Sequence, residues 1–488
     1  MDGVESMKDA KDRLILFGAG RNGQMALKKY GRKQVAFFCD NDAKKVGGEI
    51  DGVPVVAFES MLKMHEEGYV IMVTPTSHAY QCEQLAKAGI DDYLIFRSEE
   101  TRFPLRNGAD AEKEHKDYNI KLEELVSVSC RCDPLEDISS LKEAVREAKR
   151  LHTVDKRLLG QYGFHHESHY YGNMEALIDY AEIAETDIPY FPIVSHADSV
   201  PVYTVDYKYQ TAVVMSGIYY RDRIHKKAPW VPVFSVGPYI HYAKSVYTLE
   251  KMKKIKEKNG KTLLAFLPHS IEGHQRQYSY KIFVDGIMAS YGQEFTKILL
   301  CAYWADIDSM ACSYAEGRGI QVVSAGFRWD SQFDRRLRTL FELADAVVCG
   351  DMGTFIPYAI YMGKPVGMIN GKVEEDLYLM VLSDMEREMG VDGEYLKFMD
   401  SFNSLFDGEL GAESVYREFM NPFSGFDQIR SKEYIRNILK ISKDIWMQSE
   451  GDMLRYPEAV RSVYQGYEKK GEFCKMSILR ESVGAYVD

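Results

Sequence analysis

Four short segments of the sequence carry side chains suited to binding an anion or moving a proton. Each follows directly on an apolar, β-rich run of residues. The segments are Pro268-His269-Ser270 with Glu272 just beyond, Tyr303-Trp304-Ala305-Asp306, Gly326-Phe327-Arg328, and Gly350-Asp351-Met352-Gly353-Thr354. Arginine supplies a fixed positive charge, histidine exchanges protons near neutral pH, and hydroxyls and glycine turns offer hydrogen-bond donors to phosphate. One such segment alone would be unremarkable, but four together indicate a functional site.

The elements that must position these segments are the β-rich runs themselves. The runs TLLAFLPHS, FTKILLCAYWADID, IQVVSAGFRWD, ADAVVCGDMGT and PVGMING alternate with helical stretches such as SQFDRRLRTLFELADA. Alternating strand and helix signals predict a doubly wound α/β unit with a parallel sheet. Ligands bind in such sheets just beyond the carboxyl ends of the strands. We therefore expect all four segments at one edge of one sheet, in a domain spanning 256–400.

The last of these segments, GDMGT, opens the helical stretch FIPYAIYMG. Gly353 leaves room for a ligand beside the backbone, and Pro357 suits a first helical turn because its missing N–H loses no bond there. The start of a helix binds phosphate through its unpaired N–H groups and its partial positive charge. We expect Gly353 and Thr354 to hold a phosphate, and the alternative is that Thr354 only caps the helix.

Residues 344–369, ADAVVCGDMGTFIPYAIYMGKPVGMI, resemble the donor-binding segment of GT-B glycosyltransferases from bacterial capsule and lipopolysaccharide pathways. The fragments KTLLAFLPHSIEG, LLCAYWADID and SAGFRWDSQFDRRLRTLFELADA extend the likeness over 261–370. The resemblance implies transfer of a sugar from a nucleotide donor that is held in a cleft between two Rossmann-like domains. It makes 120–255 the N-terminal acceptor domain and 256–400 the C-terminal nucleotide-donor domain of a GT-B-like pair.

The resemblance also implies roles for individual side chains. His269 and Ser270 would contact the nucleotide or its phosphates. Arg328 would neutralise the leaving diphosphate, whose developing charge is the main electrostatic demand of the reaction. The helix after the phosphate turn has no acidic residue before Gly363 to bind the ribose, so the identity of the donor stays open.

A glycosyltransferase also needs a general base to take the proton of the acceptor hydroxyl. His196, in FPIVSHAD, follows a predicted strand of the acceptor domain and has Asp198 nearby to orient its ring. Glu272 is the other candidate for the catalytic base.

Two strings look like metal-binding motifs, and both are predicted to bind no metal. In HHESH, residues 165–169, the zinc motif H-E-x-x-H would need histidine at position 170, where the sequence has tyrosine. The string DID, residues 306–308, has the D-x-D spacing that holds a metal in another glycosyltransferase fold. In GT-B enzymes helix dipoles and basic residues usually replace the metal, so the resemblance implies a metal-independent enzyme with no required cofactor.

The front of the chain carries a second candidate nucleotide site. LILFGAGRNGQMALKKYGRKQVAFFCDND places Gly18, Gly20 and Gly23 between a strand and a helix, and Asp40 ends the next strand. This pattern is typical of dinucleotide binding and makes NAD an alternative ligand. Through FGAGRNGQMAL, FFCDND and DGVPVV it also resembles the small Rossmann-like domains of bacterial sugar-modifying acetyltransferases. Nucleotide binding and a purely structural role of the glycines both stay open.

The composition excludes several classes of function. The 488 residues are 45% hydrophobic and 27% charged, with a formal net charge of −12. Nucleic-acid binding needs a concentrated basic surface, which is missing. No apolar run approaches the ~20 residues of a membrane span. The eight cysteines form no C-x-x-C pair, so we expect a cytoplasmic protein without disulfides. The lysines of TLEKMKKIKEKNG suit a contact with the anionic inner face of a membrane, but the pattern favours the alternative, a solvated helix face.

The fold class expected from these observations is α/β, with three Rossmann-like doubly wound units and a helical C-terminal region. The domains are 1–97, Rossmann-like; 98–119, a linker; 120–255 and 256–400, the GT-B-like pair; and 401–488, helical. The expected function is glycosyl transfer from a nucleotide sugar to a surface-polysaccharide or lipid-linked acceptor. The alternatives are an NAD-dependent enzyme acting on nucleotide sugars and a non-catalytic scaffold for polysaccharide assembly.

Overall fold

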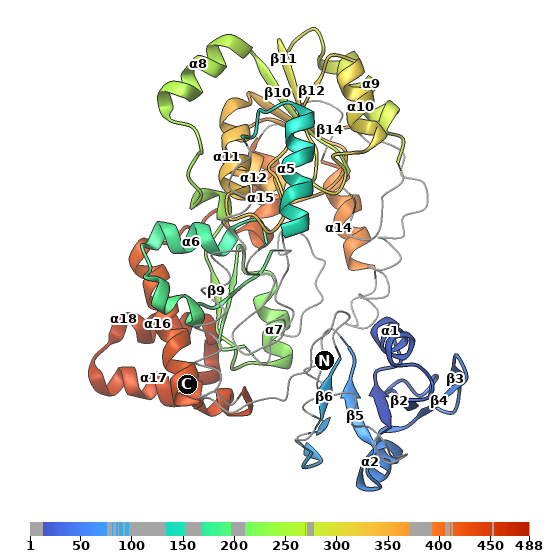
Figure 1. Ribbon diagram of the computed structural model, residues 1–488. Coiled ribbons are helices and arrows are strands. Elements are labelled where there is room, and N and C mark those ends of the chain that lie inside the picture. The colour runs from blue at the N-terminus through green and yellow to red at the C-terminus, as the bar shows by residue number, and fades with distance from the viewer. Residues whose placement is uncertain are drawn as a thin grey trace. The chain divides into compact units, whose positions relative to one another are not determined.

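The computed structural model divides into two compact units, Met1–Ala111 with Val154–Gln161, and Glu112–Thr153 with Tyr162–Asp488 (Figure 1). The residues that the structure describes are 13–75, 81, 84–85, 87–90, 93–96, 133–151, 168, 170–196, 210–268, 270, 278–369, 393–405, 410, 413–450 and 453–487. Each unit has its own apolar core.

The first unit is a β-α-β fold around one sheet. Its elements are β1 (Leu14–Phe17), α1 (Arg21–Tyr30), β2 (Val35–Cys39), β3 (Glu49–Ile50), β4 (Val53–Val56), α2 (Phe58–Glu66), β5 (Val70–Val73) and β6 (Leu94–Ile95). The strand order is β3-β4-β2-β1-β5-β6, and every pair is parallel except β3 with β4. All of β1 is buried, as expected for a central parallel strand that is covered on both faces.

The second unit contains two parallel sheets. The β7–β9 sheet has β7 (Ile193–Val194), β8 (Val213–Met215) and β9 (Val233–Ser235), in that order. The β10–β14 sheet has β10 (Thr262–Phe266), β11 (Lys297–Cys301), β12 (Gln321–Val323), β13 (Ala346–Cys349) and β14 (Val366–Met368), in the order β12-β11-β10-β13-β14. Its strands are added first to one side of β10 and then to the other. The direction therefore changes between β10 and β13, which is where open α/β sheets bind ligands.

Helices cover both sheets of the second unit. They are α5 (Ile138–Leu151), α6 (Asn173–Ala181), α7 (Arg221–Lys227), α8 (Leu249–Asn259), α9 (Tyr280–Tyr291), α10 (Met310–Gly317), α11 (Phe333–Leu343) and α12 (Phe355–Tyr361). Helix α11 is amphipathic, and its buried stripe includes Leu337, Leu340 and Phe341. Helix α8 ends at Gly260, whose φ of 63° is a conformation that glycine adopts without strain. The helix and its stop agree with the sequence prediction.

The C-terminal region is helical, with α14 (Glu394–Asn403), α15 (Glu413–Ser424), α16 (Lys432–Gln448), α17 (Tyr456–Lys470) and α18 (Phe473–Val483). Helices α16, α17 and α18 pack on one another, α16 also contacts α6, and α18 contacts β9, so the end of the chain returns to the β7–β9 sheet (Figure 1). Helix α15 is bonded to the segment between β8 and α7: the carbonyl of Pro422 accepts hydrogen bonds from the backbone N–H groups of Ile218 and Tyr219, both at 3.0 Å.

One apolar cluster joins the two sheets of the second unit. It contains Val214 and Phe234 from the β7–β9 sheet, Leu264 and Val347 from the β10–β14 sheet, and Ile438 from α16. The fold class expected from the sequence, α/β with parallel sheets and a helical C-terminal region, is therefore confirmed. No helix in the described part of the chain is long and apolar enough to span a bilayer.

Candidate active site

The carboxyl ends of β10 and β13 meet at the point where strand order changes. Gly350 follows β13, and a Cβ built there would lie 2.6 Å from the Pro268 ring that follows β10. The close approach leaves no room for a side chain, so glycine at 350 lets the two turns touch. The turn GDMGT thus lies at the expected edge of the β10–β14 sheet.

Ser270, predicted to contact the nucleotide, is 4% exposed and bonded to the protein itself. Its N–H donates to Asp306 Oδ2 at 2.7 Å and its hydroxyl to Asp306 Oδ1 at 2.5 Å. The Asp306 carboxylate therefore ties the turn after β10 to the end of β11. His269 and Glu272 lie outside the described residues.

Gly353 and Thr354 lie at the start of α12. A Cβ at Gly353 would lie 2.4 Å from the Phe355 ring, which stacks on Phe266 with centroids 4.6 Å apart. Thr354 has helical angles (φ −58°, ψ −22°) and its side chain makes no capping hydrogen bond to the helix. The geometry therefore does not show the simple capping role that was the alternative for Thr354, and it gives Gly353 a packing role beside Phe355.

Arg328, in the loop after β12, lies within a group of tyrosines that we call the tyrosine cluster: Tyr170, Tyr171 and Tyr303. The Arg328 guanidinium carbon lies 3.9 Å from the centre of the Tyr170 ring, in a cation–π contact. The Tyr171 and Tyr303 hydroxyls are 3.3 Å apart. The cluster thus surrounds one cation at the carboxyl edge of the β10–β14 sheet.

His196 reaches the same cluster from the other sheet. It follows β7, and its ring centre lies 4.7 Å from that of Tyr170, with the two planes nearly perpendicular. Tyr170 therefore contacts both His196 and Arg328. These two residues, predicted separately as base and phosphate-binding cation, come from the carboxyl ends of two different parallel sheets and meet at one ring.

Burial sets the protonation of this site. It raises the pKa of Tyr171 well above its usual value, and the neighbouring Tyr303 raises it further. Burial opposes the charge of Arg328, but Tyr170 and Tyr303 outweigh it and raise the pKa of Arg328 overall. The site therefore presents the neutral phenol of Tyr171 and a permanent cation that is partly shielded from water, where its attraction for an anion is stronger than in bulk solvent.

A strained turn holds Tyr171 in place. Its φ is +63°, and Gly172 follows with a φ of +74°. The Tyr171 N–H donates to the Arg328 carbonyl at 2.6 Å, and its carbonyl accepts from the Asp334 N–H at 2.9 Å. Non-glycine residues with positive φ cost about 1–3 kcal/mol and persist only where the surroundings fix them. Here the loop after β12 fixes one side of the turn, through Arg328, and the first turn of α11 fixes the other, through Asp334.

That loop is itself held by a buried ion pair. Arg336 and Asp330 are each 1% exposed, 2.5 Å apart, and Arg336 also donates to the Ala325 carbonyl at 2.9 Å. A Cβ at Gly326, where φ is +96°, would lie 2.6 Å from the Arg336 guanidinium. The position of Arg328 is therefore set by a rigid loop.

Asp334, at the start of α11, is 2% exposed. Among the described residues its Oδ2 has no hydrogen-bond partner. Burial raises the pKa of this carboxyl well above its usual 3.8, and the nearby Glu175 raises it further. The Asp334 carboxyl, next to the strained turn, therefore stays protonated at pH values where an exposed aspartate is already ionised.

In the first unit, the glycine turn is filled by the protein. A Cβ at Gly18, where φ is +117°, would lie 2.7 Å from Thr74 Oγ1, and one at Gly23 would lie 2.0 Å from the Gly18 carbonyl, whereas Gly20 has open space. Asp40 Oδ2 accepts from the Ala19 N–H at 2.8 Å. The Asp40 carboxylate therefore closes the turn from inside the unit, and Gly18 and Gly23 are required by close packing.

Of the two strings that look like metal-binding motifs, the structure describes Asp306 and Asp308 but not the histidines of HHESH. Among the described residues, no group of three histidine, cysteine or acidic side chains is arranged to hold a metal. Asp306 binds Ser270, and Asp308 lies 3.3 Å from Arg146 and 3.5 Å from Lys142. Most of HHESH lies outside the described residues.

Sequence reasoning missed the tyrosine cluster. In the sequence, Tyr170 stands out only because it replaces the second histidine of a zinc motif, and Tyr303 only because it follows a predicted strand. One available signal was the string YYG, residues 170–172, because glycine after two bulky residues is typical of a tight turn.

No family model matches this sequence, and no curated protein matches it. Among solved structures, the chain is similar to the UDP-GlcNAc 2-epimerase from Neisseria meningitidis bound to UDP-GlcNAc, at 13% identity over 89% of this chain and 99% of that chain, with a TM-score of 0.27. The wall teichoic acid polymerase TagF matches at 13% identity over 90% of both chains, with a TM-score of 0.27. A UDP-glucosyltransferase from Polygonum tinctorium matches at 12% identity over 88% of this chain and 98% of that chain, with a TM-score of 0.25. At these TM-scores the superpositions are loose, and the fold described above stands on the strand order of this chain alone.

Proposed function

We propose that this protein is a metal-independent glycosyltransferase of the GT-B type, which transfers a sugar from a nucleotide donor to a surface-polysaccharide or lipid-linked acceptor in the cytoplasm. The observation that supports the proposal is the meeting of His196 and Arg328 on Tyr170. The two residues come from the carboxyl ends of two parallel sheets, which is the layout of a cleft between two Rossmann-like halves.

In the proposed reaction, Arg328 stabilises the diphosphate as its bond to the sugar breaks. A preorganised cation that is partly buried is worth more to a developing anion than the same cation in water. The hydroxyls of Tyr171 and Tyr303, which lie 3.3 Å apart, supply further hydrogen-bonding groups near Arg328. The turn GDMGT, at the change of strand order, would bind the phosphates through its backbone.

His196 is the proposed base. It approaches the tyrosine cluster from the β7–β9 sheet, opposite the strand ends that would carry the donor. The imidazole there can take the proton of the acceptor hydroxyl while Arg328 stabilises the negative charge that develops on the leaving diphosphate. The proposed base and the phosphate-binding cation are thus positioned by two different sheets.

The test of the proposal is nucleotide binding. UDP, GDP and CMP are screened by thermal shift against the intact protein, where a ligand at about 100 times its Kd adds roughly 2.7 kcal/mol of stability. We expect one of them to stabilise the wild type and Arg328→Met to lose that response. Arg318→Met is the matched control, because Arg318 is an exposed arginine paired with Asp285 at 2.7 Å. Full nucleotide binding by Arg328→Met would contradict the proposal.

The role of His196 needs a separate measurement. His196→Gln is expected to keep nucleotide binding and to lower kcat by about 10²–10⁴, the usual contribution of a general base. His65→Gln in the first unit is the control, since His65 bonds to the Tyr69 carbonyl at 2.8 Å. Unchanged turnover in His196→Gln would remove His196 and leave Glu272 as the candidate. Tight NAD binding that depends on Gly20, with hydride transfer, would instead support the oxidoreductase alternative.

A further inference from the structure

A pocket of about 470 Å³ lies on the second unit, away from the proposed active site. We call it the connector pocket, after the segment between β9 and α8 that lines one side. Its walls include His241, Lys256, Arg338, Glu342, Tyr361 and Lys364. Glu342 is on the last turn of α11, just before β13, and Lys364 lies between α12 and β14. The pocket is therefore near the amino ends of these strands, whereas Arg328 follows a carboxyl end.

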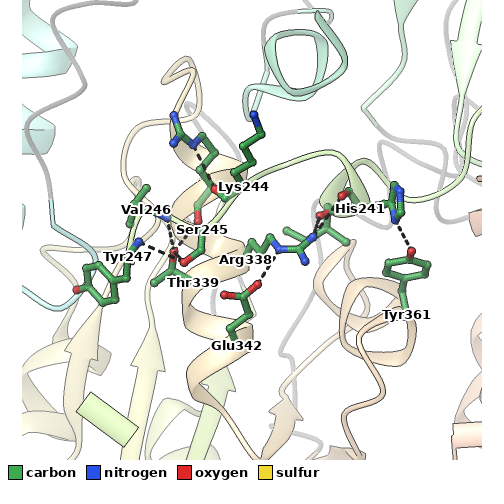
Figure 2. A network of polar contacts seen from close by, with 11 residues as sticks. His241, Lys244, Ser245, Val246, Tyr247, Arg338, Thr339, Glu342 and Tyr361 are labelled. Carbon is green, nitrogen blue, oxygen red and sulfur yellow. Dashed lines mark hydrogen bonds and ion pairs between the residues drawn. The ribbon is translucent and has the colours of Figure 1, made fainter. Parts of the chain in front are cut away.

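The segment between β9 and α8, residues 236–248, which we call the connector, is fixed to α11 by hydrogen bonds (Figure 2). Arg338 donates to the carbonyls of Ile240 at 2.8 Å and His241 at 3.2 Å. Thr339 Oγ1 accepts from the Val246 N–H at 2.9 Å. His241 Nδ1 lies 2.5 Å from the Tyr361 hydroxyl, so the imidazole is oriented by α12. The pocket is thus bounded by side chains with defined positions.

The charges around the pocket do not balance. Glu342 is already paired with Arg338, at 2.8 Å. Within the part of the chain that the structure describes, no carboxylate forms an ion pair with Lys256 or Lys364. Lys364 donates one hydrogen bond, to the Ala344 carbonyl at 2.7 Å. Two ammonium groups therefore line the pocket, and neither has a described carboxylate at ion-pair distance.

The two lysines affect each other. Burial lowers the pKa of Lys364 and the charge of Lys256 lowers it further, which together outweigh the opposite effect of the nearby Asp345 and Glu342. Like charges that repel across a pocket are relieved by an anion between them. Two ammonium groups match a doubly charged anion better than a single carboxylate, and Lys is well suited to phosphate as a compact point charge.

We propose that the connector pocket is a binding site for a small phosphate-bearing anion, held between Lys256 of α8 and Lys364 of the turn before β14. Such an anion links the connector, α8 and the amino edge of the β10–β14 sheet. The site is separate from the donor cleft and does not depend on the proposed glycosyl transfer.

Inorganic phosphate is the probe for this site. It is titrated into the intact protein at constant ionic strength, with chloride as the reference salt, and binding is followed by the melting temperature. We expect a saturable rise for the wild type and at least a ten-fold weaker response for Lys256→Met with Lys364→Met. The matched control is Lys253→Met with Lys254→Met, which removes two lysines of α8 that pair with Glu257 and Glu250.

The same titration in Arg328→Met separates this proposal from the proposed function. A response that survives Arg328→Met and is lost with the lysines belongs to the connector pocket. Lys256→Glu provides a second variant that leaves the core untouched, because Lys256 is exposed. The proposal would be overturned if phosphate raised the melting temperature equally in the wild type, in Lys256→Met with Lys364→Met, and in Lys256→Glu. An equal rise with chloride would overturn it as well.

Discussion

The two edges of the β10–β14 sheet both gather positive charge, in different ways. At the carboxyl edge, Arg328 is enclosed by the tyrosine cluster, and its backbone carbonyl accepts a hydrogen bond from the strained turn at Tyr171. At the amino edge, Lys256 and Lys364 face a pocket whose walls carry no comparable strain. A single desolvated cation in a rigid setting suits the stabilisation of a charge that develops during a reaction. Two flexible cations suit the binding of an anion that does not react.

The largest effect is expected from changing the cation at the carboxyl edge without removing its charge. Arg328→Lys keeps the charge but loses the flat face that lies on Tyr170 and the fork of donors. We expect kcat/KM for sugar transfer to fall by about 10²–10³, corresponding to about 2.7–4 kcal/mol for one lost stabilising group. Turnover is measured as nucleotide release. Equal activity of Arg328→Lys and the wild type would mean that only charge matters there, as at the amino edge.

The next effect concerns the backbone that holds the tyrosine cluster. A Cβ at Gly172 would lie 2.5 Å from the Ser331 carbonyl, and φ there is +74°. Gly172→Ala is expected to lower the free energy of unfolding by about 3 kcal/mol, since strain and clash add. Gly471→Ala is the control, with a similar φ of +69° but only a distant contact at 3.8 Å. A loss of about 1 kcal/mol in both variants would show that the turn is not tightly held.

The third effect is the pH dependence caused by Asp334. Its folded-state pKa lies above the ordinary value of 3.8 because the carboxyl is buried and Glu175 is near. Between the two pKa values the folded chain binds more protons than the unfolded chain, so stability falls as pH rises, by about 1.4 kcal/mol per pH unit for one proton. Asp334→Asn, a mimic of the neutral acid, is expected to flatten this fall and to be more stable than the wild type at pH 7. Denaturant unfolding from pH 4 to 8 measures it, and parallel curves would contradict it.

The smallest effect is a difference in salt sensitivity between the edges. The Debye length falls from about 30 Å at 0.01 M salt to about 10 Å at 0.1 M, and exposed charges are screened more than buried ones. Phosphate binding by the exposed Lys256 is therefore expected to weaken more steeply with added salt than nucleotide binding at the partly buried Arg328. Titrations of both ligands at the two salt concentrations give the slopes. Equal slopes would remove this contrast between the edges.

Local pattern predicted much of the fold. Continuous apolar runs such as TLLAF became buried parallel strands, and Asn259-Gly260 ended α8 as expected. The edge on which Ser270, Arg328 and Thr354 lie also followed from the order of strands and helices. The sequence pattern did not predict contacts between residues that are far apart along the chain. The bond from Ser270 to Asp306 spans two strand ends, and the contact of Tyr170 with His196 and Arg328 joins two sheets. The spacing of apolar residues within a strand or helix carries no information about the Ser270–Asp306 bond or about the contacts of Tyr170.

The return of the chain to the β7–β9 sheet has a consequence for biosynthesis. Strand β9 ends at Ser235, but α18, which packs on it, begins at Phe473. At about 5–20 residues per second, a ribosome needs roughly 10 to 50 seconds to make the intervening chain. During that time the apolar faces of Val214 and Phe234 lack the helices that later cover them. A chain that ends before α18 is therefore expected to leave part of this sheet uncovered and to aggregate more readily than the full chain.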